Sequence, residues 1–102
     1  MYKIIQTTTN DNDNALEISN AIIKKKISPC IHIIKNIKSV FTWKKKIEIK
    51  NEYLLQIKCK KSNIEKINKL INFYHNYDNA EIISYDIEIL NEDYRNWLEK
   101  SY

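Results

Sequence analysis

The fold is decided by one long stretch, residues 30–60, which carries the letters CIHIIKNIKSVFTWKKKIEIKNEYLLQIKCK. Residues 30–34 form a nearly continuous apolar run, which predicts a central strand, and from residue 47 onward apolar and polar residues alternate with the period of two that is typical of β-strands. The two halves meet near residues 44–46, a run of three lysines. The stretch therefore predicts one long β-hairpin with its tip at these lysines, or two hairpins if the chain also pairs near Asn36.

The sequence on either side of the hairpin predicts further strands and helices. Period-two alternation predicts strands over residues 2–9 and 83–89, and apolar residues at helical spacing predict helices over residues 15–26 and 64–74. Asn14 with Glu17 predicts a capping box for the first helix, and Asn91 predicts the N-cap of a short last helix. This order predicts a single α+β domain over residues 1–102, a ferredoxin-like split βαβ sandwich with a long hairpin and an extra C-terminal helix.

The predicted hairpin is too long for so small a sheet. Its projecting part has to pair with another strand, because an open strand edge promotes aggregation. We therefore expect the edge to be covered by partner subunits.

The composition excludes several functional classes. The chain of 102 residues contains no glycine, and phosphate-binding loops, dinucleotide fingerprints and nucleophile elbows all depend on glycine. Turns with positive φ are expected at Asn or Asp instead. No nucleophile–base pair or pair of carboxylates stands at a useful spacing, so we expect no enzyme. The net charge of +4 comes mostly from lysine runs, which are expected on solvated faces, and no nucleic-acid partner is expected.

The two cysteines indicate a reducing compartment. Cys30 and Cys59 form no C-x-x-C pair, so they predict neither a zinc site nor a redox motif. Both lie in apolar strand-like runs, where a thiol acts as a small hydrophobic group. No signal peptide and no membrane span are visible. We therefore expect a cytoplasmic protein without a membrane partner.

Four segments carry a family likeness. Residues 28–34 (SPCIHII) with residues 39–43 (SVFTW) resemble the Ala-Ala-Cys-Val-Asn-Ile … Ser-x-Tyr-x-Trp segment of the CutA family. Residues 52–58 (EYLLQIK) are similar to that family's Glu-x-Leu-Leu-x-x-Lys strand, and residues 75–82 (HNYDNAEI) to its His-Pro-Tyr-Glu-x-Pro-Glu-Ile block. Residues 94–98 (YRNWL) resemble its closing Tyr-x-x-Trp-[Ile/Leu]. The family's hairpin glycine falls at Lys45, and its two prolines fall at Asn76 and Ala80.

The resemblance implies a homotrimer in which the hairpins of neighbouring subunits continue one another's sheets. It also implies a role in divalent-cation tolerance, for which copper binding has been proposed, so Cu²⁺ or another divalent cation is the expected cofactor. His75 and Glu81 match plausible ligand positions for such a cation. The position of a further family cysteine is taken by Gln6. A hydrogen-bonded structural histidine is the alternative for His75.

The resemblance also implies a cleft between subunits, and the candidate residues of that cleft or interface lie on several elements. They are Cys30, His32, Trp43, Glu52, Lys58, Tyr77 and Trp97. A structural role stays open for each: packing for the aromatic residues and Cys30, a hydrogen bond for His32, and an ion pair for Glu52 and Lys58.

Three functions remain open for such a chain. The first is a trimeric, non-enzymatic metal-binding tolerance protein. The second is a regulatory or scaffolding trimer like the PII signalling proteins, which binds a protein partner or a small ligand rather than a metal. The third, an RNA-binding module, would use Phe41 and Trp43, but the glycines of the RNA-recognition consensus are missing.

Overall fold

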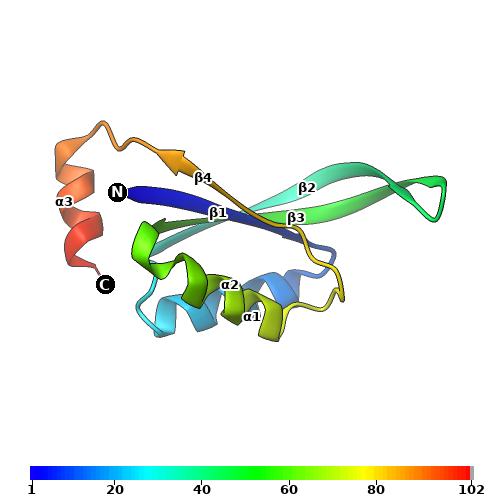
Figure 1. Cartoon of the computed structure of the whole chain (residues 1–102), viewed down its shortest axis with the longest axis horizontal. Helices are drawn as coiled ribbons and strands as arrows, with labels where there is room; N and C mark the ends of the chain where they lie inside the picture. Colours follow the sequence, from blue (N-terminus) through cyan, green and yellow to red (C-terminus); the bar gives the residue numbers. More distant parts are fainter. Residues whose placement is uncertain (102) are drawn as a thin grey trace.

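The computed structural model describes residues 1–101 and has the predicted α+β class. Four antiparallel strands form one sheet in the order β2-β3-β1-β4, which is the split βαβ topology. Two helices, α1 and α2, lie side by side on one face of the sheet (Figure 1). In chain order the elements are β1 (Tyr2–Thr9), α1 (Asn12–Lys24), β2 (Cys30–Trp43), β3 (Lys46–Lys60), a 3-10 turn (Lys61–Asn63), α2 (Ile64–Tyr74), β4 (Ile82–Ile87) and α3 (Glu92–Lys100).

The core lies between the helices and the face of the sheet that they cover. Ile5 is paired with Ile57, and Thr7 with Leu55, so odd-numbered residues of β1 and β3 share this face. All four side chains are at most 1% exposed. The helices complete the core with residues at helical spacing: Ala15, Ile18, Ile22, Ile67 and Ile71. Even-numbered residues of β1 and β3 face the other way, and we call that side of the sheet the open face.

The β2–β3 hairpin extends well beyond the other strands (Figure 1). Strand β1 pairs with β3 only over residues 53–60, so the hairpin continues alone over residues 37–52. We call residues 37–52 the hairpin arm. A register shift between Ile34 and Ile37 marks its base, and five large apolar side chains on it are exposed. These are Val40, Phe41, Trp43, Ile47 and Ile49. A two-stranded hairpin is marginally stable alone, so the arm needs a covering partner.

The turns show how a chain without glycine bends. Four described residues have positive φ: Lys26, Asn36, Lys44 and Lys45. The expectation that Asn or Asp would fill such positions is therefore wrong at three of the four. Lys44 and Lys45, at φ 49° and 65°, form the two-residue hairpin turn, whose favoured types need positive φ at both positions. A side chain with a Cβ adopts this conformation at a cost, which glycine would avoid.

The last helix lies at the end of the sheet away from the arm (Figure 1), where it contacts the open-face residues Tyr2 and Lys60. Its Leu98 is fully buried, and its Glu99 accepts a hydrogen bond from the Tyr2 hydroxyl and forms a 3.4 Å ion pair with Lys60. The predicted cap is confirmed, because the Asn91 side chain accepts a hydrogen bond from the Tyr94 backbone N–H at 2.8 Å. Leu98 and Glu99 therefore fix the position of α3.

Two boundaries differ from the predictions. Helix α1 begins at Asn12 because Asp11 is its N-cap and accepts a hydrogen bond from the Asp13 backbone N–H. Asn14, predicted to be the cap, is instead buried inside the first turn. Strand β4 ends at Ile87 rather than at residue 89, because Ile87 pairs with Tyr2, the first residue of β1.

Candidate functional site

The loop after α2 meets the end of β1 through His75. Its Nε2 lies 2.8 Å from the Thr8 carbonyl oxygen, and its Nδ1 accepts a hydrogen bond from the Tyr77 backbone N–H at 3.0 Å. The carbonyl can only accept, so Nε2 carries the proton and donates. Both ring nitrogens are thus engaged within the chain. His75 fixes the loop to β1, and we call this contact region, with its neighbours Asn14, Asn76, Tyr77 and Glu52, the histidine junction.

Asparagine side chains stabilise the histidine junction through hydrogen bonds between segments that are distant in the sequence. Asn14 donates a 2.8 Å hydrogen bond to the Tyr74 carbonyl oxygen at the end of α2. Asn76 donates a 2.9 Å hydrogen bond to Asn10, and its backbone N–H donates to Asn14 Oδ1 at 3.4 Å. A proline at residue 76 could donate no such backbone bond. Asn76 therefore holds the loop through polar contacts that a proline could not fully provide.

Tyr77 connects the junction to the hairpin. Its hydroxyl donates a 2.7 Å hydrogen bond to the Glu52 carboxylate, which is only 6% exposed. Burial and the neighbouring Glu52 carboxylate raise the pKa of Tyr77 above its usual range, because both disfavour a phenolate. The hydroxyl thus remains a donor at every physiological pH. Among the described residues 1–101, Glu52 contacts Tyr77, and no ion pair joins it to Lys58, which lies six residues away on β3.

The remaining polar candidates lie on or beside the open face. Glu81 is exposed, with its carboxylate 3.4 Å from the Gln6 side-chain amide. His32 is exposed on β2, where it is paired with Gln56. Gln56 and Gln6 both contact the Tyr85 hydroxyl, at 3.3 and 3.5 Å. A polar strip therefore crosses the open face between His32 and Glu81.

A second cluster lies beneath α3. Cys30 is half-buried, and its Sγ lies 3.9 Å from Lys58 Nζ. Burial, together with a hydrogen bond to Cys30, raises the pKa of the Tyr94 hydroxyl to about 12. Tyr94 stacks on Trp97 at 5.6 Å, and Trp97 remains 48% exposed. Cys30 is thus at the boundary of the packing under α3, whereas Cys59 is a fully buried core residue.

Trp43 stands apart from both clusters, at the tip of the arm. It is 53% exposed, and the Lys44 ammonium lies 5.9 Å from its ring centroid. The structure of one chain therefore distributes the predicted site residues over four regions. His75, Tyr77 and Glu52 come together; Glu81 and His32 lie at the two ends of the polar strip on the open face; Cys30, Lys58 and Trp97 lie near α3; Trp43 is alone.

The residues of one chain do not form a complete metal site. Within residues 1–101 no group of three His, Cys, Asp or Glu side chains is placed to hold an ion. Breaking the hydrogen bond between His75 and the Thr8 carbonyl would cost about 1 kcal/mol, which is small compared with the free energy of metal binding at a complete site. The obstacle is the number of ligands, because zinc and copper take about three or four. His75 and Glu81 supply at most two.

Sequence reasoning missed the asparagines that support the junction. The sequence predicts a capping role for Asn14 and no structural role for Asn76, and only their long-range contacts reveal that both support the junction. A signal was present, because Asn76 takes a position where the family has proline. Such a change requires that the new polar group find partners.

Fold and site together define a class of protein. It is a small ferredoxin-like sandwich with a projecting hairpin arm that exposes apolar side chains, and with a polar junction where the arm leaves the sheet. No helix within the described residues is both long and apolar enough to cross a membrane.

Comparison with known proteins identifies the family. The model of the CutA1 divalent ion tolerance protein family matches residues 3–101, and the chain belongs to this family. It is 30% identical over 98 residues to the chloroplastic protein CutA of Arabidopsis thaliana, covering 96% of this chain and 54% of the relative. It is 33% identical over 86 residues to protein CutA of Mus musculus, covering 84% and 49%. The chain thus spans about half the length of these relatives.

The solved structures agree with this assignment. The crystal structure of CutA1 from Oryza sativa superposes with a TM-score of 0.92 at 28% identity, covering 98% of this chain and 92% of that one. CutA1 from Ehrlichia chaffeensis gives a TM-score of 0.91 at 27% identity, covering 98% and 94%. The predicted family and fold class are therefore confirmed.

Proposed function

We propose that this chain is a homotrimeric, non-enzymatic protein of divalent-cation tolerance, and that it binds a divalent cation, copper first among them, in clefts between its subunits. Membership of the CutA1 divalent ion tolerance family supports the role in tolerance. The observation that carries the assembly is the hairpin arm. It exposes five large apolar side chains, and no strand within residues 1–101 pairs with either outer edge of it.

The assembly follows from the need to cover these edges. Strands β2 and β4 are the two edges of the sheet, and each presents unpaired backbone groups. An arm from one subunit that adds to an edge of another subunit would satisfy both sets of groups. Three copies related by a threefold axis close such head-to-tail contacts into a ring, whereas an open series would form fibres.

The cation would then be held at the subunit boundary. His75 and Glu81 are the contribution of one chain, and a neighbouring copy has to complete the ligand set, because two ligands make a weak site. Glu52, Tyr77 and the supporting asparagines would keep the His75 loop in position. Cys30, His32, Lys58, Trp43 and Trp97 are proposed to line the cleft or the subunit interface.

The free thiols support a reducing location. Cys30 and Cys59 form no disulfide, and Cys59 is buried in the core. We therefore propose a cytoplasmic site of action, which localisation of the tagged full-length protein in its own cells would test. Secretion or organellar import of the tagged protein would contradict it.

A calorimetric titration of metal-free protein with Cu²⁺ and Zn²⁺ tests the cation. We expect saturation near one ion per chain, and loss of binding in both Glu81→Gln and His75→Ala. Glu81 is exposed with one weak contact, so its variant keeps the fold and isolates the ligand role. Glu65→Gln, on the exposed first turn of α2, is the matched control and should bind normally. A trimer that binds neither ion would contradict the proposal and leave a regulatory or scaffolding trimer.

A further inference from the structure

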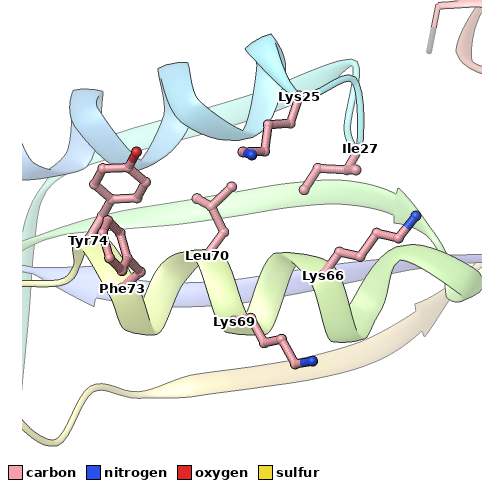
Figure 2. A pocket seen from close by; sticks show the side chains of 7 residues that line it. All are labelled: Lys25, Ile27, Lys66, Lys69, Leu70, Phe73 and Tyr74. Carbon is pink, nitrogen blue, oxygen red and sulfur yellow. The ribbon is translucent and has the colours of Figure 1, made fainter.

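A hollow lies between α1 and α2 on the helical side of the molecule. Its volume is about 650 Å³. It is lined by Lys25, Ile27, Lys66, Lys69, Leu70, Phe73 and Tyr74, and we call it the helix hollow (Figure 2). Pockets for small organic ligands usually have volumes of about 300–1,000 Å³, so the helix hollow is large enough for one.

The C-terminus of α1 builds one wall of the hollow. The Lys26 N–H bonds to the Ile23 carbonyl and the Ile27 N–H to the Ile22 carbonyl, and Lys26 has a φ of 58°. This is the Schellman end of a helix. It turns Ile27 back toward the core, where it is 8% exposed, and it leaves Lys25 beside the gap between the helices (Figure 2).

Helix α2 supplies the apolar part of the hollow. Leu70 is directed into the gap between the helices, and Phe73 packs edge-on against Tyr74 with ring centroids 4.9 Å apart (Figure 2). Phe73 is 80% exposed. An exposed aromatic ring beside other apolar groups offers a surface that the apolar part of a ligand can cover.

The charged groups of the hollow are all positive. Lys25, Lys66 and Lys69 line it with no acidic residue, and the ion pairs recorded within residues 1–101 involve none of them. The Lys25 ammonium lies over Leu70, and Lys66 extends toward the side of Ile27 (Figure 2). Lys69 points away from the gap (Figure 2). Two ammonium groups therefore flank an apolar floor.

We propose that the helix hollow binds a small amphipathic anion: an aromatic ring or short acyl chain that bears a carboxylate or phosphate head. The apolar body would cover Leu70, Phe73 and Tyr74, and the head would lie between Lys25 and Lys66. A purely polyanionic ligand would use the lysines and leave the exposed Phe73 uncovered. The site lies on α1 and α2 and meets the histidine junction only at Tyr74, whose carbonyl oxygen accepts the hydrogen bond from Asn14. Its lysines and Phe73 belong neither to the junction nor to the hairpin arm, so the proposal does not rest on the proposed cation site.

Fluorescence titration of the full-length protein with 8-anilinonaphthalene-1-sulfonate tests this site. We expect saturation near one probe per chain, with weaker binding as salt is added. Phe73→Ser should abolish the signal without unfolding, because this side chain is exposed. Leu90→Ser, which removes another exposed large apolar side chain outside the arm, is the matched control and should leave the titration unchanged. Loss of the signal in Trp43→Ser but not in Phe73→Ser would place the probe on the arm and overturn the proposal.

The lysines provide a second, internal comparison. Lys25→Gln and Lys66→Gln should each weaken the probe by about two- to fivefold, the range of an exposed charge pair. Lys69→Gln should have a smaller effect, because that ammonium points away. Equal effects at all three positions would indicate general attraction and contradict a defined head site.

Competition identifies the class of ligand. Decanoate and decyl phosphate should both displace the probe if charge and an apolar chain are the shared requirement, and their relative strength distinguishes a carboxylate from a phosphate head. Decanol, which lacks the charge, should compete poorly. Displacement by an acidic phenylalanine-containing peptide but by neither amphiphile would overturn the proposal in favour of a protein-docking surface.

Discussion

Replacement of His75 by alanine measures how much the histidine junction contributes to stability. The change removes the 2.8 Å contact with the Thr8 carbonyl and the 3.0 Å bond from the Tyr77 N–H. A protein hydrogen bond contributes about 0.5–1.5 kcal/mol net, and a polar group left unsatisfied costs more. Because the site is half-buried, water can replace part of the loss, and we expect a destabilisation of about 2 kcal/mol.

Urea unfolding at a fixed chain concentration is the appropriate assay, because the stability of an assembled protein depends on concentration. With a slope of about 1–2 kcal/mol per molar urea, the midpoint should fall by about 1–2 M. Lys69→Ala is the control, since Lys69 is exposed on α2 and forms no recorded ion pair within residues 1–101. Its free energy of unfolding should change by less than about 0.5 kcal/mol.

A second substitution separates the two contacts of the ring. The His75 Nδ1 accepts from a backbone N–H two residues ahead, and an asparagine side-chain oxygen can accept from the same position. His75→Asn should therefore recover about half of the lost stability. If His75→Ala and Lys69→Ala had the same small effect, His75 would not be a structural residue and the junction as described would be wrong.

Three further predictions concern the turn, α3 and the thiols. Lys45→Gly should raise the free energy of unfolding by about 1 kcal/mol, because Lys45 has a φ of 65°; an unchanged urea midpoint would refute the strained turn. Hydrogen bonding to Tyr2 and the nearby Lys60 lower the pKa of Glu99 below its ordinary value of 4.5, so its stabilisation is present above that value and is lost as the pH falls through the folded pKa. In thermal melts, Glu99→Gln should therefore be less stable than wild type at pH 7 and equal to it at low pH, and a gap that persists in acid would contradict this. Burial raises the pKa of Cys59 to about 11, so iodoacetamide should label Cys30 in the folded protein and Cys59 only after unfolding, as mass spectrometry of the peptides would report; early labelling of Cys59 would contradict its burial.

Local chemistry was sufficient to predict the element order. Period-two alternation located the hairpin and its tip, and the Asn91 cap was assigned correctly because one good N-cap residue stands directly before the acidic first turn of α3. The start of α1 was misassigned because residues 10–14 offer several capping side chains. The choice of Asp11 follows from a tertiary contact, since Asn14 is used to bind the Tyr74 carbonyl 60 residues away.

The site was less accessible to sequence reasoning than the fold. The sequence left two roles open for His75, a metal ligand or a hydrogen-bonded structural residue. It could not reveal the partner, because Thr8 is 67 residues away and contributes a backbone carbonyl, which every residue type has. The turn lysines were missed for a related reason. Positive φ at Lys44 and Lys45 is imposed by the twist of the flanking strands, which overrides the residue preference.

The exposed arm and its bare strand edges support the central claim that three copies of this chain assemble through the hairpin. Sedimentation equilibrium of the wild-type chain tests this claim most directly, with Ile47→Asp on the arm as the comparison. The account predicts about 37 kDa for three chains of 12.3 kDa each, and a smaller mass for the variant, because a carboxylate on this exposed apolar strand would be buried by the neighbour. A wild-type mass of one chain at micromolar concentration, or an Ile47→Asp variant that remains a full trimer, would contradict it.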